Sequence, residues 1–455
     1  MPVNTYTPQP SPTTDPLATP KPPLQYYTQA GDTLDSIAGR FGVTPEQILS
    51  NEYLPADGLI NPGNLLIIPD VLNGVYDSLT MIPDSEVVYS PSAVGFDIID
   101  YVNSAGGYLN TYTETVGTKR YTGAEIVQRV ALENSINPYL LLTLLEYKSH
   151  WVTGTPTNMA ETEYPMGMIR LEQRGLYKQL SWAVEQLSIG YYGWRAGTLN
   201  SLTFKDGSTV RISPGLNAGT ASIQYLFSRW HNQAEWAEAL YGSNNLTDLM
   251  SQMFGDLWSR ASVVDPLYPA DLEQPEFTLP FYPHRVWALT GGPHSAWGAG
   301  GALAALDFAP PSSVSGCVQS NEWVTAVAPG VIARSGNGVV ILDMDGDGVE
   351  QTGWNVMYLH IETRDRVKAG TIVNTGDKIG HPSCEGGVSS GTHVHIVRKF
   401  NGEWILAGGP LPFALSGFLA KNGERPYEGM LVNDTLKVIA DPLSSAKSSI
   451  QLPEF

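Results

Sequence analysis

Two histidines near the C-terminus, His393 and His395, are separated by a single residue in the run 391–398. Side chains alternate across a β-strand, so both imidazoles would lie on one face while Val394 lies on the other. Paired imidazoles on an open strand face are typical of a metal site or an acid/base pair rather than of packing. The run therefore predicts a strand that carries chemistry on one face and packs through the other.

Three further residues upstream, His294, Asp307 and His360, can complete a zinc site. Zinc in proteins takes about four tetrahedral ligands from His, Cys and carboxylate side chains, and a catalytic site leaves one position to water. His294, Asp307 and His395 would supply two nitrogens and one oxygen. His360 and His393 would then be free imidazoles beside the metal.

The elements that position these residues are predicted to be strands. Asp307 lies between the apolar residues Leu306 and Phe308, so one strand face is expected to be buried while the carboxylate points to the other. Residues 339–342 and 354–359 also have the character of strands. We expect an antiparallel β domain over residues 263–455.

Such a site would activate water for hydrolysis. Zinc lowers the pKa of a bound water from about 16 to about 7 and polarises the carbonyl. We expect His393 to accept the proton of that water and His360 to donate to the oxyanion or to the leaving amine, although the sequence does not fix which histidine has which role. Tyr358, two residues before His360, would support the oxyanion or simply be packed. His360 by itself is also compatible with a hydrogen-bonded histidine at a strand end.

The same motifs resemble the beta-lytic branch of the lysostaphin-type zinc metalloendopeptidases, which cut peptide bonds in bacterial cell walls. In that branch the first zinc histidine and the zinc aspartate are thirteen residues apart, as His294 and Asp307 are. The better-known lysostaphin spacing of four would place a histidine at 303, where this chain has Leu303. The resemblance spans about 277–440. It implies one zinc held by His294, Asp307 and His395, with His360 and His393 as catalytic histidines.

One alternative to an active zinc site remains. A decayed copy of the fold would hold no metal, but such copies usually lose a ligand, and here the full set is present. The remaining histidines are interpreted as structural or surface residues: His150, His231, His284 and His381.

An acidic run, Asp343-Met-Asp345-Gly-Asp347-Gly348, matches the first half of a calcium-binding loop. The twelfth position is Trp354 instead of the bidentate glutamate, although Glu350 is near. The alternative is an acidic turn between two strands of a β-hairpin. Calcium is therefore a possible second metal.

The chain has two cysteines, Cys317 and Cys384, without metal-ligand spacing. Free thiols are one interpretation and a disulfide is the favoured one. A disulfide closing a loop of this length would stabilise the fold by about 4 kcal/mol in the loop-entropy model. It would also hold the loop before the His393 strand and would fit an oxidising compartment.

Residues 24–70 have the order strand–helix–helix–strand. Asp32 is expected to cap the first helix, and Thr44, followed by Pro45, the second. The segment closely resembles a LysM module, a family that binds N-acetylglucosamine-containing glycans; a ligand-free βααβ domain is the alternative. The resemblance implies that the sugar lies between two segments that contain Gly31, Asp32, Thr33, Ile60 and Asn61.

Residues 119–262 are predicted to be helical. A capping box opens at Thr122, and the run 139–145 is apolar on every side, which indicates burial. The region resembles a lysozyme-like domain, but Lys148 stands where that family has its catalytic glutamate. We therefore expect a degenerate, non-catalytic domain. The exception would be an acid supplied from another position, with Glu133, Glu146 and Glu161 as candidates.

Length and charge agree with a modular α+β protein. A Pro/Thr-rich linker (1–23) precedes the LysM module, and a connector (71–118) joins it to the helical domain. The net charge of −19 argues against nucleic acid or an anionic membrane as partner. No apolar run reaches the roughly 20 residues of a membrane helix. Because the chain opens inside a linker, we expect that an export signal or anchor has been removed.

The sequence thus predicts a secreted, cell-wall-associated zinc endopeptidase. Its expected partner is peptidoglycan, both the peptide cross-bridge and the glycan, and the resemblance implies cleavage at glycyl bonds. A non-enzymatic cell-wall binding protein is the alternative from another class, and a broad elastase-like peptidase is a third.

Overall fold

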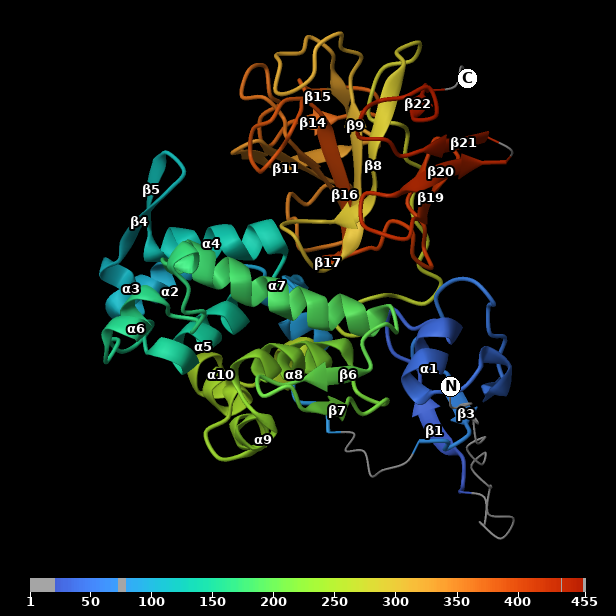
Figure 1. Ribbon diagram of the computed structural model, residues 1–455. Helices are drawn as coiled ribbons and strands as arrows, with labels where there is room; N and C mark the ends of the chain where they lie inside the picture. Colours follow the sequence, from blue (N-terminus) through green and yellow to red (C-terminus); the bar gives the residue numbers. More distant parts are fainter. Residues whose placement is uncertain (1–20, 73–78, 435, 453–455) are drawn as a thin grey trace, which may run out of the picture.

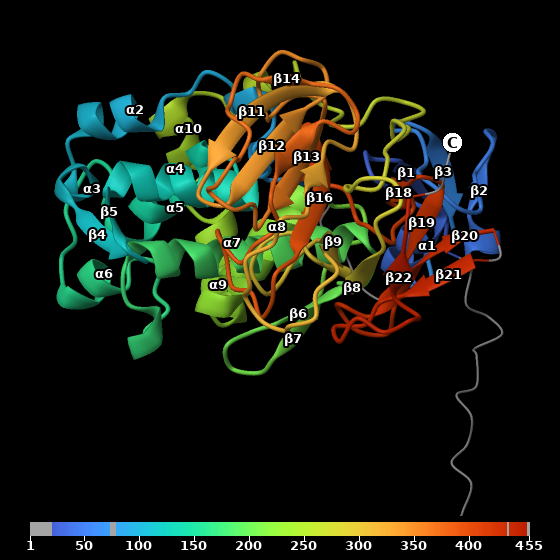
Figure 2. The same cartoon turned by 90° about the horizontal axis from the view of Figure 1, so that it is seen from above.

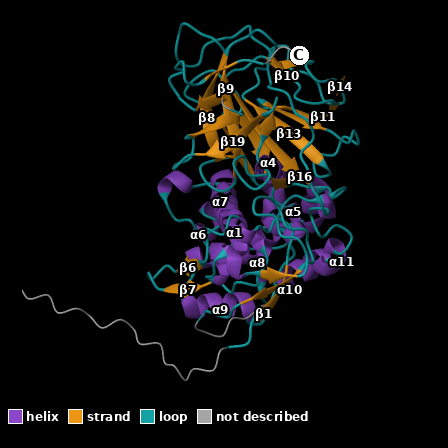
Figure 3. Cartoon of the chain, turned by 90° about the vertical axis from the view of Figure 1, so that its right-hand side faces the viewer, coloured by secondary structure: helices purple, strands orange, loops and turns teal. Residues whose placement is uncertain are grey.

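The computed structural model describes residues 21–72, 79–434 and 436–452. Most of the linker predicted for 1–23 lies outside the described residues. Strands are concentrated in one layer and helices in the layer beneath it (Figure 3). The protein therefore has the mixed helical and antiparallel β composition that was predicted. Within the described residues, no helix has the length and apolar character needed to cross a bilayer.

The N-terminal module (residues 24–70) is a small antiparallel sheet covered by one helix. The sheet has the order β1-β3-β2. Its elements are β1 (Leu24–Tyr27), α1 (Leu34–Phe41), the 3-10 turn η1 (Pro45–Gln47), β2 (Leu49–Ser50) and β3 (Leu65–Ile68). The second predicted helix is thus only a single turn. Thr33, and not Asp32, caps α1, because the Asp32 carboxylate is buried against Arg40 and Tyr26.

The helical domain (residues 79–268) is built around α5, whose residues Leu140–Leu145 are all buried. The predicted capping box opens α4, with Thr122 and Glu125 bonded reciprocally. The long α7 packs along α8. The helices are α2 (Ile98–Ala105), α3 (Tyr108–Thr111), α4 (Gly123–Asn134), α5 (Pro138–Ser149), α6 (Met159–Glu163), α7 (Leu176–Arg195), α8 (Ala218–Trp230), α9 (Gln233–Tyr241), α10 (Leu246–Phe254) and α11 (Leu257–Ala261).

Short elements complete this domain. They are the 3-10 turns η2 (Asp84–Glu86), η3 (Pro91–Ala93) and η4 (Leu171–Gln173), and the hairpins β4 (Thr113–Val116) with β5 (Lys119–Thr122) and β6 (Ser201–Thr203) with β7 (Thr209–Arg211). The segment predicted to be a connector takes part in the domain core, because Ile82, Val102 and Leu109 are fully buried in it.

The sheet domain (residues 277–452) contains one large antiparallel sheet of order β14-β11-β12-β13-β16-β9-β8-β22. Its strands are β8 (Trp287–Ser295), β9 (Leu303–Ala309), β11 (Gly330–Gly336), β12 (Val339–Asp343), β13 (Trp354–Leu359), β14 (Ile372–Val373), β16 (Val394–Phe400) and β22 (Ser449–Ile450), with β17 (Glu403–Trp404) paired to β16. The smaller sheets contain β10 (Val324–Thr325) and β15 (Lys378–Gly380), and β18 (Ala414–Leu415), β19 (Phe418–Asn422), β20 (Gly429–Asn433) and β21 (Leu436–Ile439).

The two faces of the large sheet differ, as the alternation in the sequence predicted. Leu306, Phe308, Val394 and Ile396 enter a core that belongs to the sheet domain alone. The other face contributes Met357, Leu359, Val397 and Ala305 to a core shared with the helical domain. Figures 1 and 2 show this sheet standing on α4 and α7. The helical and sheet domains therefore share one continuous apolar interior.

Candidate metal and catalytic site

Three adjacent strands bring together His294, Asp307 and His395, which we call the donor triad. β16 pairs with β9 so that His395 lies opposite Asp307. Nε2 of His294 is 3.0 Å from Nδ1 of His395, and Oδ1 of Asp307 lies 3.3 Å and 3.1 Å from these nitrogens. Ligands of a tetrahedral zinc lie about 3.3 Å from one another, so this spacing fits zinc.

Backbone carbonyls fix the orientation of both triad histidines. Nδ1–H of His294 donates to the carbonyl of Gly292 (2.8 Å), and Nε2–H of His395 donates to that of Ala296 (3.1 Å). The two nitrogens that face each other therefore carry lone pairs in the neutral rings. Lone pairs 3.0 Å apart repel unless a cation or a proton lies between them, and such outer hydrogen bonds are typical of metal-binding histidines.

The helical domain supports the loop that carries Ala296. This loop connects β8 to β9, and its Ala296 N–H donates to the carbonyl of Ala302 (2.9 Å). A Cβ at Gly301 would lie 2.6 Å from the Cβ of Ser188 in α7, so the two backbones are in close contact. The orientation of His395 thus depends on packing between the two domains.

His360 and His393, which we call the histidine pair, lie beside the triad with their ring centroids 4.5 Å apart. Nδ1–H of His360 donates to the carbonyl of Glu385, and Nδ1–H of His393 donates to that of Gly391, both at 2.8 Å. Each ring therefore keeps Nε2 free. Nε2 of His393 lies 3.5 Å from Oδ1 of Asp307, so this atom is placed at the edge of the triad.

Burial and charge act in opposite directions on the triad. Burial disfavours the Asp307 carboxylate, but His294 and His395 outweigh it and hold the pKa of Asp307 well below its usual range. Burial likewise opposes the charged form of His294, yet Asp307 raises the pKa of this ring. Burial lowers the pKa of His395. The site thus concentrates one negative charge among buried imidazoles, which favours a bound cation.

Burial, reinforced by repulsion from His393 and His395, lowers the pKa of His360 to about 3. The ring is therefore neutral across the neutral pH range. This leaves the Nε2 lone pair of His360 available to accept a hydrogen bond.

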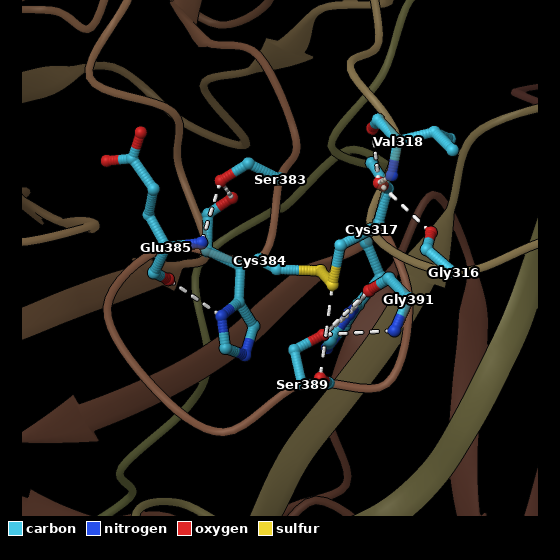
Figure 4. Close-up of a disulfide and its surroundings, with 11 residues drawn as sticks. Gly316, Cys317, Val318, Ser383, Cys384, Glu385, Ser389 and Gly391 are labelled. Carbon is cyan, nitrogen blue, oxygen red and sulfur yellow. Dashed lines mark hydrogen bonds between the residues drawn. A yellow bond between two sulfur atoms is a disulfide. The ribbon is translucent and has the colours of Figure 1, made fainter.

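The predicted disulfide between Cys317 and Cys384 is present (Figure 4). It joins two loops whose backbone carbonyls accept hydrogen bonds from His360 and from the residue before His393. Cys384 precedes Glu385, whose carbonyl orients His360. On the other loop, the carbonyl of Gly316 accepts the N–H of Thr392, the residue before His393. The disulfide therefore ties together the backbone that positions both histidines.

Tyr358 does not lie where the alternation placed it. Its side chain is in the core on the opposite sheet face, and its hydroxyl accepts the N–H of Val327 (2.8 Å). The strand ends at Leu359, and His360 has a positive φ of 66°, so the period of two stops before His360. The structure confirms the alternative interpretation, a packed tyrosine, and shows no contact that would give Tyr358 the supporting role.

Tyr427, which the sequence did not single out, stacks on His294 with centroids 4.1 Å apart and planes inclined by 20°. It comes from the connection between β19 and β20, and its N–H donates to the carbonyl of Pro293 (3.1 Å). The side chain is half exposed. Tyr427 lies in a loop and belongs to no motif or alternating pattern, so nothing in the sequence signals its contact with His294.

A groove of about 1040 Å³ opens beside the triad. Asp307 and His393 lie in it, with Tyr427 at one wall and the loop 310–322 at another. Among the described residues, those that line this groove fall between Val286 and Ser449. The helical domain and the N-terminal module therefore leave this groove uncovered.

The remaining predicted sites are placed as follows. Asp343, Asp345 and Asp347 converge in the turn between β12 and β13, as both the calcium and the hairpin interpretations require. Glu350 is not free to join them, because it pairs with Arg334 (2.5 Å) and Lys399 (3.0 Å). This removes the acid nearest to the missing twelfth ligand.

The predicted glycan residues have mixed surroundings. Asp32 is buried within the N-terminal module, Thr33 caps α1 and Ile60 is buried. Gly31 and Asn61 lie at the junction with the rest of the chain. A direct side-chain contact from Asp32 to a sugar is therefore not supported.

Two family models match parts of the chain. Residues 80–268 match the family model described as "LasA, N-terminal domain", and residues 26–69 match the LysM domain. The predicted resemblance of the helical domain to lysozyme is not among these matches and stays a prediction.

The chain is a homologue of two named peptidases. It is 27% identical to Protease LasA of Pseudomonas aeruginosa (strain UCBPP-PA14) over 293 residues, covering 60% of this chain and 65% of LasA. It is 27% identical to the beta-lytic metalloendopeptidase of Lysobacter enzymogenes over 174 residues, covering 34% of this chain and 94% of that protein. The chain thus spans somewhat less than two thirds of the length of LasA.

Among solved structures, the M23 metalloprotease pseudoalterin from the deep sea is 24% identical, with 38% of this chain and 96% of that chain covered. The TM-score is 0.31, so this superposition adds no argument to the sequence matches.

Proposed function

We propose that this chain is a secreted zinc metalloendopeptidase that hydrolyses peptide cross-links of bacterial peptidoglycan at glycyl bonds. The observation that carries the proposal is the donor triad, in which three ligand atoms lie 3.0–3.3 Å apart with both histidine tautomers fixed. The names of the two homologues, a protease and a metalloendopeptidase, support the same reaction class.

A zinc ion held by His294, Asp307 and His395 would supply Lewis-acid chemistry, polarising a peptide carbonyl and acidifying water. Nε2 of His393, 3.5 Å from Asp307, is the atom placed to take a proton from the attacking water. The His360 ring lies beside the His393 ring, with their centroids 4.5 Å apart. Its Nε2 would exchange a proton with the leaving amine. Tyr427, half exposed at the groove wall, would orient the substrate beside His294.

We further propose that the protein works at the cell wall, outside the cell. The match of residues 26–69 to the LysM domain supports binding to N-acetylglucosamine-containing glycan. The disulfide supports an oxidising compartment. The uncovered groove supports access of a large, wall-bound peptide.

The test is digestion of purified peptidoglycan with the full chain, followed by mass spectrometry of the released peptides. We expect new amino termini at glycyl residues, about one zinc per chain, and loss of activity on treatment with a chelator. A zinc-free protein that binds walls without releasing peptides would overturn the proposal in favour of a non-enzymatic binding protein. Cleavage of Gly-Gly-rich soluble proteins as well would indicate a broader, elastase-like peptidase.

A calcium ion held by Asp343, Asp345 and Asp347 is a separate proposal, supported only by the convergence of three carboxylates in one turn. Added calcium should raise the melting temperature of the wild type and leave Asp345→Asn unchanged. An equal melting temperature with and without calcium would leave the acidic hairpin turn as the interpretation.

A further inference from the structure

The N-terminal module is docked on the rest of the chain through the segments predicted to bind glycan. Asn61 forms two hydrogen bonds with Asp271: Nδ2–H donates to Oδ1 of Asp271 (3.2 Å), and Oδ1 of Asn61 accepts the N–H of Asp271 (2.9 Å). One side-chain donor and the side-chain acceptor of Asn61 are thus engaged by the docking surface. A sugar that used Asn61 would have to compete for the same atoms.

The second predicted glycan segment is covered as well. A Cβ at Gly31 would lie 3.0 Å from Nη1 of Arg195, which places this loop against the end of α7. Next to it, Nε2–H of Gln29 donates to the carbonyl of Gly215 (3.3 Å). Arg211 donates to the carbonyl of Arg40 (2.7 Å) in the last turn of α1. In Figure 1 the module, marked by α1, β1 and β3, lies beside the helical domain at the end of α7.

The space left between the docked surfaces is small. A cavity of about 170 Å³ lies between residues 58–62 of the module and a wall formed by 268–272 and 410–411. Ligand sites generally measure about 300–1,000 Å³. A glycan of several sugars therefore does not fit while the module is docked.

The N-terminal module can separate from the helical domain without losing its own core. The core of the module is a separate cluster around Ile37, Leu66 and Ile68, and of its buried apolar residues only Ala30 joins the core of the helical domain. The contacts across the junction combine the hydrogen bonds above with the partly buried Leu59 against the helical core and the Arg40 guanidinium 5.2 Å from the centre of the Trp194 ring. The helical and sheet domains, in contrast, share one continuous core and cannot separate without exposing it.

We propose that N-acetylglucosamine-containing glycan and the docking surface around Asp271 compete for the N-terminal module, so that glycan binding releases the module from the rest of the chain. The inference rests on the glycan binding proposed above. The apparent dissociation constant is then the intrinsic one divided by the undocked fraction. Weakening the docking surface, without touching the module, should therefore tighten glycan binding.

The first experiment measures binding of a soluble N-acetylglucosamine tetramer by calorimetry. Asp271→Gly combined with Arg211→Ala removes the side-chain hydrogen bond between Asn61 and Asp271 and both bonds from Arg211 to the carbonyls of Gly39 and Arg40. Glycine tolerates the positive φ of 55° at position 271. We expect affinity about 3- to 30-fold higher than in the wild type, since each hydrogen bond contributes modestly. The matched control, Glu273→Gly with Arg170→Ala, makes the same charge changes at exposed positions and should bind like the wild type.

The outcomes are distinct. Equal, measurable affinity in the wild type and the docking variant would overturn the competition and leave glycan binding intact. Absence of binding in every variant would overturn glycan binding by the module, and the competition with it, whereas the peptidase is judged by peptide release.

The second experiment follows amide hydrogen exchange in the wild type. The N–H of Asp271 is protected by Asn61 when the module is docked. Addition of the tetramer should accelerate exchange of the peptide that contains 268–272 and leave strands of the sheet domain unchanged. Unchanged or slower exchange at 268–272 with glycan bound would show that the sugar binds to the docked module and would overturn the proposal.

Discussion

The donor triad and the histidine pair lie side by side, but different parts of the structure hold them. The triad comes from three neighbouring strands, and sheet register places His395 opposite Asp307. The pair depends on loops: His360 lies just past the end of β13, and His393 just before β16. Strand register therefore positions the three donor atoms of the triad, and loop closure positions the two imidazoles of the pair.

The largest effect is expected when one donor of the triad, which the strands hold, is removed. His395→Ala should remove zinc and reduce hydrolysis to background, because two donors hold the metal far more weakly than three. Zinc per chain by inductively coupled plasma mass spectrometry and peptide release from peptidoglycan measure this. His150→Asn, at an exposed histidine after α5, is the control and should keep both. Zinc retained in His395→Ala but lost in His393→Ala would reverse the two assignments.

Substitution of the histidine pair should separate metal binding from turnover. His360→Ala and His393→Ala are each expected to keep zinc while kcat falls about 100- to 10,000-fold, the range for a lost acid/base group. Steady-state kinetics on a cross-bridge peptide, with the zinc content measured on the same samples, checks this. If either variant lost zinc, that histidine would belong to the metal site, and the division between strands and loops would fail.

A smaller effect is expected when the disulfide between the two loops is removed and the donor triad and the histidine pair are left unchanged. Replacement of Cys317 and Cys384 by serine should lower the free energy of unfolding by about 4 kcal/mol. It should also reduce kcat by about 10- to 100-fold through misplacement of the pair. Zinc content should remain, since the carbonyls that orient the triad lie elsewhere, at Gly292 and Ala296. Zinc loss in the double variant would show that the loops also hold the triad.

This division also explains what the sequence could predict. The alternation around Asp307 is a local feature of a strand, and the spacing of the triad was recognised through the resemblance to a known family. The structure brings these residues together as expected. Tyr358 was misplaced because a period of two was extended past Leu359, where the strand ends. Tyr427 stacks on His294 from a loop 133 positions later, and nothing local marks such a contact.

Contacts between domains were equally hidden from the sequence. Residues 71–118 were predicted to be a connector, yet Ile82 and Val102 are buried in the helical core. The sharing of a core between helices and sheet depends on which sheet face is left uncovered, and that choice is made by long-range packing. Docking of the N-terminal module relies on polar pairs such as Asn61 with Asp271, which leave no pattern.

The last prediction is that the helical domain contributes no glycosidase activity. The hydrogen bonds of its acidic residues differ from those of the site histidines. Each histidine of the site uses one ring nitrogen for a backbone carbonyl and does not use the other for a backbone group. Glu146, the acid nearest to Lys148 on α5, keeps neither oxygen free: it accepts the N–H groups of Val152 and Thr153 and the Thr153 hydroxyl. It therefore closes the turn after α5 instead of presenting a proton.

Lys148 cannot replace it, because its ammonium lies 4.5 Å above the Trp230 ring and burial lowers its pKa without giving it the function of a carboxylic acid. Glu133 is held by Arg129 (2.7 Å) and the Tyr177 hydroxyl (2.8 Å). We therefore expect full-length His395→Ala, whose peptidase is inactive, to release no reducing ends or anhydro-muropeptides from peptidoglycan. Product analysis by mass spectrometry, with the wild type alongside, decides it. Glycan cleavage by this variant, lost on Glu146→Gln or Glu133→Gln, would identify a second active site that these contacts do not predict.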